Sequence, residues 1–534
     1  MFKANILFLF CSFMFLVKAS AESTINLWWA ECPLKNDFSQ CVSPGSTSKN
    51  SILLQSPQNY RINAALMVKN NGKQAVVLRP ELYAPELQNN IIMRESVFIR
   101  SRAGILFADI LPKISKGGAI CVSAGETQQI FLEINTDGLA SGSYKASLNL
   151  WDVNNKKVSS ATLQLMVSKL KLSSQNMDLL VWDCSLRQLQ GKNAEKLAKF
   201  LGESGVDIFH VLEKIKIKFN KEGNIVGEPD FTLLDRTLDI VRPYAEMVLL
   251  RGCCIFCPGP SKIFPEQRNK KDQSLAASDY SIQYGTLAWK NAVHNYTKAL
   301  RSHLAKRGWE KSEWALYPYD EYIGVYFSDF AREVKKVDPE IRIFGNSVRA
   351  GSPELLVEKL KNEIDIYDPP YAHFGEKKYK QLFKTTKKYL KKRWSYFCHI
   401  QQLRSSPTTK YRLMGWNTFV WENDGAGYWS ATGFDGKRWG GDPWDDTDGK
   451  SSNETTLYIS DGKIIESRRW IGVKTGLRDN ALFLKAQDLA EKDSKKTALL
   501  LLLNTDIPNM VAQPKEEKMQ DIIHKIVYLT EQGE

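Results

Sequence analysis

Two adjacent carboxylates, Asp320 and Glu321, are the residues of this sequence best placed for acid–base chemistry. They end the stretch EWALYPYDE, residues 313–321, whose bulky apolar and aromatic residues predict a short strand buried on both faces. Pro318 lies near the end of that stretch, where a strand no longer needs every backbone donor. If such strands form a parallel barrel, their carboxyl ends carry the chemistry. The sequence therefore predicts that both carboxylates stand on the rim of a pocket. The alternative is a solvated acidic turn at the start of a helix.

The other predicted strand ends supply aromatic, amide and charged side chains. The set comprises Trp182, Asp183, Arg251, Tyr317, Tyr322, Asn346, Tyr367, Asp368, His399, Trp416, Asn417 and Trp421. Aromatic rings stack on the apolar faces of sugars, and carboxylates and amides bind sugar hydroxyls. For each aromatic residue taken singly, core packing is the simpler explanation. Their convergence on one rim is what favours a carbohydrate-binding pocket.

Glycosidic cleavage needs a proton for the leaving oxygen and a group that stabilises the developing positive charge. The seventh predicted strand ends in Cys398 and His399, which argues against a carboxylate nucleophile on that strand. Two neighbouring carboxylates instead fit substrate assistance, in which a 2-acetamido group attacks its own anomeric carbon. One acid then protonates the leaving group, and its neighbour orients and stabilises the charged amide.

The elements that must position these residues alternate as short apolar strands and amphipathic helices between residues 176 and 490. The candidate strands are 179–184, 207–212, 246–252, 314–321, 341–346, 364–369, 394–399 and 415–421. Eight is the number that a (β/α)8 TIM barrel requires, whereas a doubly wound open sheet would not need eight equivalent strands. The long stretches 253–280 and 423–460 are expected to be lids or binding loops.

Three further segments flank the predicted barrel. Residues 24–172 alternate apolar and polar positions between turn signals, which predicts an all-β sandwich. Residues 491–534 are expected to form a C-terminal helical segment packed on the barrel. Residues 1–21 combine Lys3, an apolar run and a small-residue end, which is typical of a signal peptide. We therefore expect an exported protein, periplasmic or extracellular, without a membrane span.

At this point the sequence resembles glycoside hydrolase family 123, the retaining β-N-acetylgalactosaminidases. The resemblance rests on Tyr317-x-x-Asp320-Glu321 and on the late stretch SRRWIGVKTGLRDNALF, residues 467–483. It implies a β-sandwich followed by a catalytic (β/α)8 barrel. It also implies that Asp320 stabilises the substrate amide and that Glu321 is the general acid. The chain departs from the family at Tyr322, where relatives often have proline, and at 479–481, where Asp-Asn-Ala replaces Asp-Tyr-Glu.

Charge and cysteine patterns add little further chemistry. Much of the formal charge of +13 lies in residues 377–393, where lysines and apolar residues alternate at helical spacing. A solvated face of an amphipathic helix explains that pattern, and a polyanion site is the alternative. No nucleic-acid-binding module is recognisable. Cys254-x-x-Cys257 is half of a zinc ligand set without a second half, so neither a metal nor a cofactor is expected.

Two rival functions remain open from the sequence. One is a non-catalytic carbohydrate-binding or scaffold protein on a decayed barrel. The other is a glycosidase of a sugar without an acetamido group, with Glu422 or an acid of residues 423–460 as nucleophile.

Overall fold

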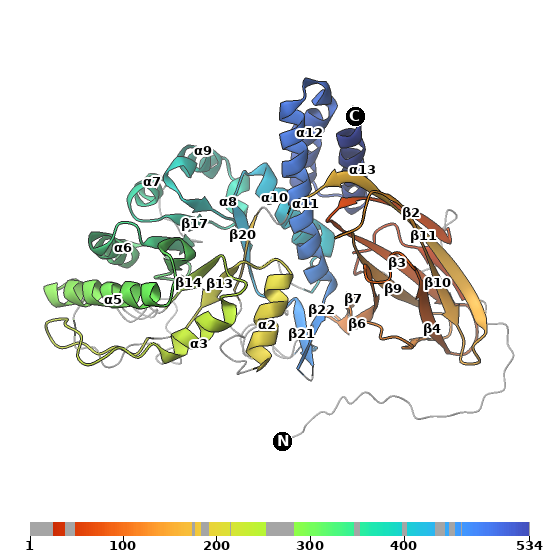
Figure 1. The fold of residues 1–534 in the computed structure, drawn as a ribbon, viewed down its shortest axis with the longest axis horizontal. Helices are drawn as coiled ribbons and strands as arrows, with labels where there is room; N and C mark the ends of the chain where they lie inside the picture. The colour runs from red at the N-terminus through yellow and green to blue at the C-terminus, as the bar shows by residue number, and fades with distance from the viewer. Residues whose placement is uncertain are drawn as a thin grey trace, which may run out of the picture.

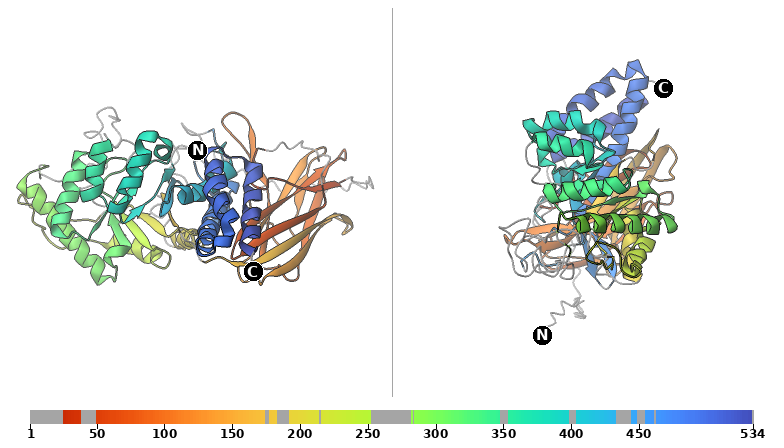
Figure 2. Two further views of the ribbon diagram at one scale, coloured as in Figure 1. Left: turned by 90° about the horizontal axis from the view of Figure 1, so that it is seen from above. Right: turned by 90° about the vertical axis from the view of Figure 1, so that its left-hand side faces the viewer.

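The chain begins with a strand-rich region, continues into a curled parallel sheet, and ends in helices that lie between the two (Figure 1). The view from above shows the same arrangement (Figure 2). The computed structural model describes residues 25–37, 49–173, 177–182, 192–213, 215–251, 282, 284–346, 353–397, 403–432, 444–447, 454–460 and 462–532. No helix within these ranges is long and apolar enough to cross a membrane.

The N-terminal region contains two sheets and a hairpin. One sheet has the order β1-β3-β9-β5, the other has the order β2-β11-β10-β4-β8, and β6 pairs with β7. The strands are β1 Ile25–Trp29, β2 Ser51–Gln58, β3 Arg61–Asn70, β4 Val76–Tyr83, β5 Ile91–Glu95, β6 Val97–Arg100, β7 Leu106–Ile110, β8 Ile120–Val122, β9 Thr127–Asn135, β10 Gly142–Trp151 and β11 Lys157–Lys171. Alternate residues such as Leu66, Leu148 and Leu163 meet in one core between the sheets. The strand-rich character predicted for this region is confirmed, and two sheets around one core agree in part with the predicted sandwich.

The second region is a nine-stranded parallel sheet with the order β18-β17-β16-β15-β14-β13-β12-β20-β19. Its strands are β12 Asp178–Trp182, β13 Ile208–Val211, β14 Met247–Leu250, β15 Trp314–Leu316, β16 Arg342–Asn346, β17 Ile366–Asp368, β18 Lys392–Arg393, β19 Tyr396–Phe397 and β20 Gly425–Trp429. β18 pairs with β17, whereas β19, a few residues further along the same segment, pairs with β20. The sheet therefore curls into a TIM-like barrel.

The prediction of a strand over 415–421 is wrong, because these residues lie in helix α10, Leu413–Val420. The strand between β12 and β19 is instead β20, which contains Gly425 and Gly427. A Cβ atom at Gly425 would lie 2.4 Å from the carbonyl oxygen of Asp178, and one at Gly427 would lie 2.5 Å from the Trp182 ring. These close approaches require glycine, and glycine removes the apolar pattern by which a strand is recognised.

Helices cover the outer face of the barrel sheet. They are α2 Lys192–Glu203, α3 Thr232–Val241, α5 Leu287–Lys306, α6 Val325–Val337, α7 Pro353–Asn362, α8 Ala372–Gly375 and α9 Lys377–Thr386. The predicted apolar face of α5 is buried at Trp289, Val293, Tyr296, Leu300 and Leu304. Side chains alternate along each strand between this outer core and a smaller core inside the barrel. Trp182, Tyr317 and Phe344 belong to the inner core.

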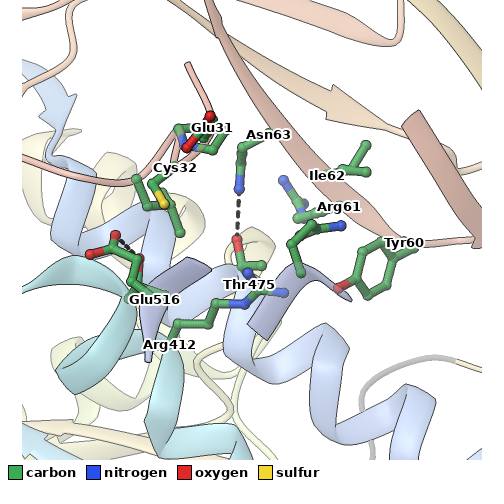
Figure 3. Close-up of a pocket in the computed structure, with 13 residues that line it drawn as sticks. Glu31, Cys32, Tyr60, Arg61, Ile62, Asn63, Arg412, Thr475 and Glu516 are labelled. Carbon is green, nitrogen blue, oxygen red and sulfur yellow. Dashed lines mark hydrogen bonds between the residues drawn. The ribbon is translucent and has the colours of Figure 1, made fainter. Parts of the chain in front are cut away.

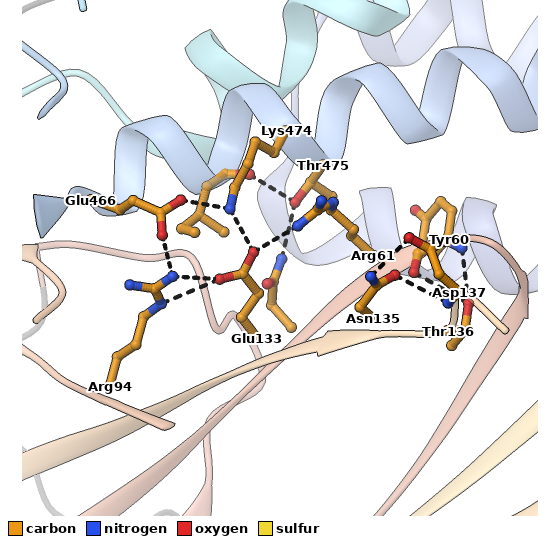
Figure 4. Close-up of polar contacts among 12 residues, drawn as sticks. Tyr60, Arg61, Arg94, Glu133, Asn135, Thr136, Asp137, Glu466, Lys474 and Thr475 are labelled. Atoms are coloured by element: carbon orange, nitrogen blue, oxygen red, sulfur yellow. Dashed lines mark hydrogen bonds and ion pairs between the residues drawn. The ribbon is translucent and has the colours of Figure 1, made fainter. Parts of the chain in front are cut away.

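Helix α11, Arg468–Lys492, joins the two regions and contains most of the late stretch 467–483. Its Lys474 ammonium group lies 2.5 Å from a carboxylate oxygen of Glu133 on β9, and this ion pair is drawn in Figure 4. The same carboxylate pairs with Arg94 at 2.7 Å and with Arg61 at 3.0 Å. Glu466, at the end of β22 Lys463–Glu466, pairs with Lys474 at 2.6 Å and with Arg94. These buried ions are tolerated because each charge has an opposite partner.

Two further buried clusters extend the same junction. The Arg469 guanidinium lies 2.8 Å from the Asp109 carboxylate on β7. The Asp479 carboxylate accepts hydrogen bonds from Arg412 at 2.6 Å, from the Trp416 indole at 2.7 Å, and from the Tyr60 hydroxyl. Asp479 is therefore a structural partner of three distant side chains, and it directly precedes Asn480 and Ala481, where the chain departs from the family pattern.

Beside these ions lies a cavity of about 30 Å³ (Figure 3). Its lining includes Tyr60, Arg61, Arg412 and Glu516, and the Asn63 amide donates to the Thr475 hydroxyl at 3.0 Å. Such a volume holds about one water molecule and no sugar ring.

The C-terminal helices α12, Thr497–Ala512, and α13, Glu516–Glu531, both contact α11, and α13 also contacts β11 and β2 of the N-terminal region. α12 additionally contacts α10. Their apolar residues join the core of the two N-terminal sheets. The segment thus packs between the two regions rather than on the barrel alone.

Candidate active site

Asp320 follows β15 and is held by two groups from the barrel interior. The guanidinium of Arg251, which follows β14, lies 3.1 Å from Oδ2 of Asp320. The Tyr317 hydroxyl donates to Oδ1 of Asp320 at 2.6 Å. Burial alone would raise the pKa of Asp320, but the charge of Arg251 and the Tyr317 hydrogen bond outweigh burial and lower it. The side chain keeps 41% of its surface exposed, so solvent screens this ion pair in part. Asp320 is therefore an ionised carboxylate that a ligand can reach.

Glu321 has a left-handed backbone, with φ of 53°. A non-glycine residue adopts this conformation only where its surroundings hold it there. Here the side-chain oxygen of Asn346, the last residue of β16, accepts the Glu321 backbone N–H at 3.0 Å. The same oxygen lies 2.9 Å from the Tyr317 hydroxyl. Asn346 thus fixes the turn that presents the two adjacent carboxylates.

Several polar groups at this end of the barrel interior have no hydrogen-bond partner among the described residues. They are both ring nitrogens of His210 and both carboxylate oxygens of Asp368. Both side chains are nearly or fully buried. Buried polar groups are normally paired, so the unpaired groups of His210 and Asp368 are an exception within the described part of the barrel. The aromatic rings of Tyr317, Tyr396 and Trp429 lie in the same interior.

His210 on β13 was not predicted as a site residue. Its ring lies 5.3 Å from the Tyr317 ring, and burial, together with the charge of Arg251, lowers its pKa to about 3. It is therefore a neutral imidazole at physiological pH. The signal for it was its place in the strand DIFHVL, residues 207–212, where a polar side chain at an inward position is otherwise unexplained.

The structure brings together Asp320, Glu321, Tyr317, Arg251 and Asn346 through direct contacts. Trp182 and Asp368 lie in the same barrel interior, both against Gly427. Tyr322 directly follows Glu321, and its ring lies 5.5 Å from that of Tyr319.

Other predicted site residues lie elsewhere. The Tyr367 ring points into the outer core, 6.1 Å from Phe383 of α9. Trp416 is buried under α11 with its indole on Asp479, because its segment is a helix and not a barrel strand. Trp421 ends the same helix and stacks on Phe374 at 4.4 Å.

Three sequence predictions concern residues that the structure does not describe. Asp183, His399 and the predicted lid 253–280 lie outside the described residues. Asn417 is buried on α10 and lines a cavity with Tyr371 and Trp421.

An acidic cluster lies at the opposite, amino end of the barrel strands. Asp178, Asp207 and Glu246 could together hold a metal ion by their spacing. The Lys392 ammonium, however, already lies 2.9 Å from both Asp178 and Glu246. Burial and the nearby Asp178 carboxylate raise the pKa of Asp207 to about 8. This cluster joins three neighbouring parts of the sheet, and it lies away from the end where barrel enzymes bind substrates.

Comparison with known proteins agrees with this geometry. Residues 187–483 match a sequence model described as "Glycoside hydrolase 123, catalytic domain". A solved family 123 glycoside hydrolase from Clostridium perfringens, studied for glycolipid glycan hydrolysis, matches with a TM-score of 0.67 at 13% identity, covering 95% of this chain and 98% of that one. A Parabacteroides merdae β-glucuronidase matches at 8% identity, covering 76% of this chain and 47% of that one, with a TM-score of only 0.24. No curated protein sequence matches the chain.

Proposed function

Because the chain belongs to glycoside hydrolase family 123, we propose that it is a retaining enzyme that releases a terminal β-linked N-acetylhexosamine, with N-acetylgalactosamine as the expected sugar. Family membership supports a glycoside hydrolase acting on a glycan. The observation that carries the finer proposal is the pairing of two adjacent carboxylates in different settings. Arg251 and Tyr317 keep Asp320 ionised, while Glu321 stands in a turn held by Asn346.

In the proposed first step, the oxygen of the substrate's acetamido group attacks the anomeric carbon. The glycosidic carbon–oxygen bond breaks, and Glu321 gives its proton to the leaving oxygen. Asp320 accepts a hydrogen bond from the acetamido N–H and stabilises the positive charge that develops on it. An ionised group suits this role, because only a negative charge gains interaction energy as the amide becomes cationic.

In the proposed second step, Glu321 takes a proton from water, and the water oxygen attacks the anomeric carbon. The bond between the acetamido oxygen and the anomeric carbon, which closed an oxazoline ring in the first step, breaks. The acetamido group is restored, and the sugar leaves with its original configuration. No step uses a metal or a cofactor. Export guided by residues 1–21 remains part of the proposal, since those residues lie outside the described ranges.

The substitution Glu321→Gln tests the acid role. General acid catalysis contributes roughly 10²- to 10⁴-fold, and a good leaving group needs it less. Across a series of aryl β-N-acetylgalactosaminides, the loss should shrink as the phenol becomes more acidic. An equal loss for every phenol would assign Glu321 another role.

The substitution Asp320→Asn tests the intermediate. It should lower kcat much more than it raises KM, because the contact strengthens in the transition state. A thiazoline mimic should bind the parent enzyme far more tightly than the product sugar does, and that advantage should shrink in the variant. A fluorosugar trapped on any Asp or Glu would contradict substrate assistance.

Matched aryl β-N-acetylgalactosaminide, β-N-acetylglucosaminide and β-galactoside distinguish this proposal from its rivals. Preferred cleavage of the galactoside would favour a protein nucleophile, and cleavage of none would favour a binding protein. Glu422, the nucleophile of that rival, has an 80% exposed side chain that lies 3.7 Å from the Lys387 ammonium. It therefore lies on the surface rather than in the barrel interior.

A further inference from the structure

Asp368 is a buried acid without any protein partner that the structure describes. It ends β17, its relative exposure is 0%, and neither carboxylate oxygen has a hydrogen-bond partner among the described residues. A lone carboxylate charge costs several kcal/mol to bury, so the group avoids that cost by holding a proton. Burial correspondingly raises the pKa of Asp368 well above its usual value. Burial therefore favours the protonated form of Asp368, a carboxylic acid with one donor and one acceptor to satisfy.

The position of Asp368 connects it to the two carboxylates. In the parallel pairing of β16 and β17, Asp368 lies beside Asn346. The side-chain oxygen of Asn346 lies 2.9 Å from the Tyr317 hydroxyl, which donates to Asp320. A continuous line of contacts therefore runs from Asp320 to the neighbour of Asp368, along one end of the barrel interior.

Across the barrel, Asp368 faces the glycine of β20. A Cβ atom on Gly427 would lie 3.3 Å from Oδ2 of Asp368 and 2.5 Å from the Trp182 ring. The acid and the indole thus approach one bare stretch of backbone from two sides. The buried Trp182 indole N–H and Asn346 amide nitrogen add two donors to the same interior.

A purely structural role does not account for this arrangement. A buried polar group normally has a partner, and an apolar side chain of similar size would avoid the desolvation cost of both oxygens. Groups that break this rule are expected where the missing partner is a ligand. A sugar hydroxyl, which both donates and accepts, would satisfy the acid.

We propose that Asp368 is a specificity-determining residue that donates a hydrogen bond to one ring hydroxyl of the sugar bound against Asp320 and Glu321. The proposal rests on the proposed function, because it places a sugar in this pocket. The hydroxyl bound by Asp368 is then a position at which the pocket tells one sugar from another. A sugar that lacks this hydroxyl leaves the acid buried and unpaired, which is the condition under which discrimination is strong.

The test measures binding, and methyl glycosides suit it because methanol is a poor leaving group. Isothermal titration calorimetry would compare methyl β-N-acetylgalactosaminide with its 3-, 4- and 6-deoxy analogues on the parent protein, on Asp368→Ala and on Asp368→Asn. We expect one deoxy analogue to bind the parent roughly tenfold to a hundredfold more weakly. Asp368→Ala should weaken the intact sugar similarly and should not weaken that analogue further. Asp368→Asn keeps a donor and should stay within about threefold of the parent.

Asp365→Asn is the matched control, because it changes the same group at the amino end of the same strand. Asp365 pairs with the Lys335 ammonium at 2.6 Å on the outer side of the barrel, so the sugar affinities should not change. Thermal melts of every variant separate lost binding from lost folding. If the alanine variant does not fold, the pH dependence decides. Sugar affinity should fall at alkaline pH in the parent, as Asp368 ionises, and not in Asp368→Asn.

The proposal would be overturned if the loss of affinity caused by Asp368→Ala simply added to the loss of affinity of every deoxy analogue. A pH dependence that Asp368→Asn leaves unchanged would also overturn it. If methyl β-galactoside shows the expected coupling while acetamido sugars are neither bound nor cleaved, the proposed substrate fails and the role of Asp368 stands. If acetamido sugars are cleaved and no coupling appears, the proposed substrate stands and the role of Asp368 fails.

Discussion

Removing the Tyr317 hydroxyl should shift the acid limb of activity to higher pH. The Tyr317 ring packs edge-on against Phe344 at 4.7 Å and lies near His210, contacts that phenylalanine preserves. Tyr317→Phe therefore deletes a hydrogen bond of 2.6 Å to Asp320 with little loss of packing. Since that bond lowers the pKa of Asp320, its removal must raise the pKa.

The size of the effect follows from the type of bond. A hydrogen bond to a charged group contributes about 1.5 to 3 kcal/mol, and the exposure of Asp320 favours the lower figure. About 1.4 kcal/mol corresponds to a tenfold change. At a pH on the acid limb, kcat/KM should therefore fall roughly tenfold. At higher pH, where Asp320 is ionised in both proteins, the loss should be much smaller.

The assay is kcat/KM for an aryl β-N-acetylgalactosaminide between pH 3 and pH 8, with thermal melts at each pH. The sign is fixed, because an acid whose pKa rises needs a higher pH to ionise, so activity disappears earlier as pH falls. An acid limb that does not move, or one that moves to lower pH, would refute the reasoning. Arg251→Gln should move the limb in the same direction, since it removes the positive charge beside Asp320.

Three further predictions concern stability. The raised pKa of Asp207, about 8, means that the folded state holds a proton that the unfolded chain releases above about pH 4. Stability from this proton is thus lost as pH rises toward 8, and Asp207→Asn should raise Tm more at pH 8.5 than at pH 4.5. An equal shift at both values would contradict it. Glu133→Gln should cost about 3 to 5 kcal/mol in urea unfolding, because Arg94 and Lys474 keep buried charges without a full partner, whereas the exposed Glu203→Gln should cost less than about 0.5 kcal/mol. Similar losses for both would remove the buried network as a source of stability. Gly476→Ala should lower Tm by several degrees, because its Cβ would lie 2.3 Å from a backbone carbonyl oxygen of the helix packed against it.

The position of Asp320 and Glu321 after a buried strand could be predicted from the sequence because it depends on one short strand. Apolar residues before Asp320 and Glu321 fixed where β15 lies, and a carboxyl end in a parallel sheet fixed where its acids point. The position of Trp416 could not be predicted, because the apolar pattern of GWNTFVW fits a helix as well as a strand. β20 was missed because Gly425 and Gly427 carry no hydrophobic pattern.

Two other features depend on inward or outward facing and on distant contacts. Tyr367 and Asp368 are adjacent, yet alternation sends the first into the outer core and the second into the barrel. An error of one residue in the register of the predicted strand exchanges the directions in which these two side chains point. The late stretch 467–483 was recognised as a motif, but its purpose was not visible, because Glu133 and Asp109, which pair with Lys474 and Arg469, lie more than 300 residues earlier in the chain.

Those long sequence separations bear on how the chain is made. Glu133 and Asp109 are synthesised early, whereas the cations of α11 that neutralise them emerge only after the barrel strands. Until then Asp109 lacks its Arg469 partner and Glu133 has only Arg61 and Arg94, and loop closure across such distances is slow. We expect an N-terminal fragment ending at residue 172 to remain soluble only with these acids hydrated and its inner sheet face open. Both regions would then reach the native state together, once α11 is complete. A chain truncated before residue 468 should therefore not fold and should be degraded by cellular proteases.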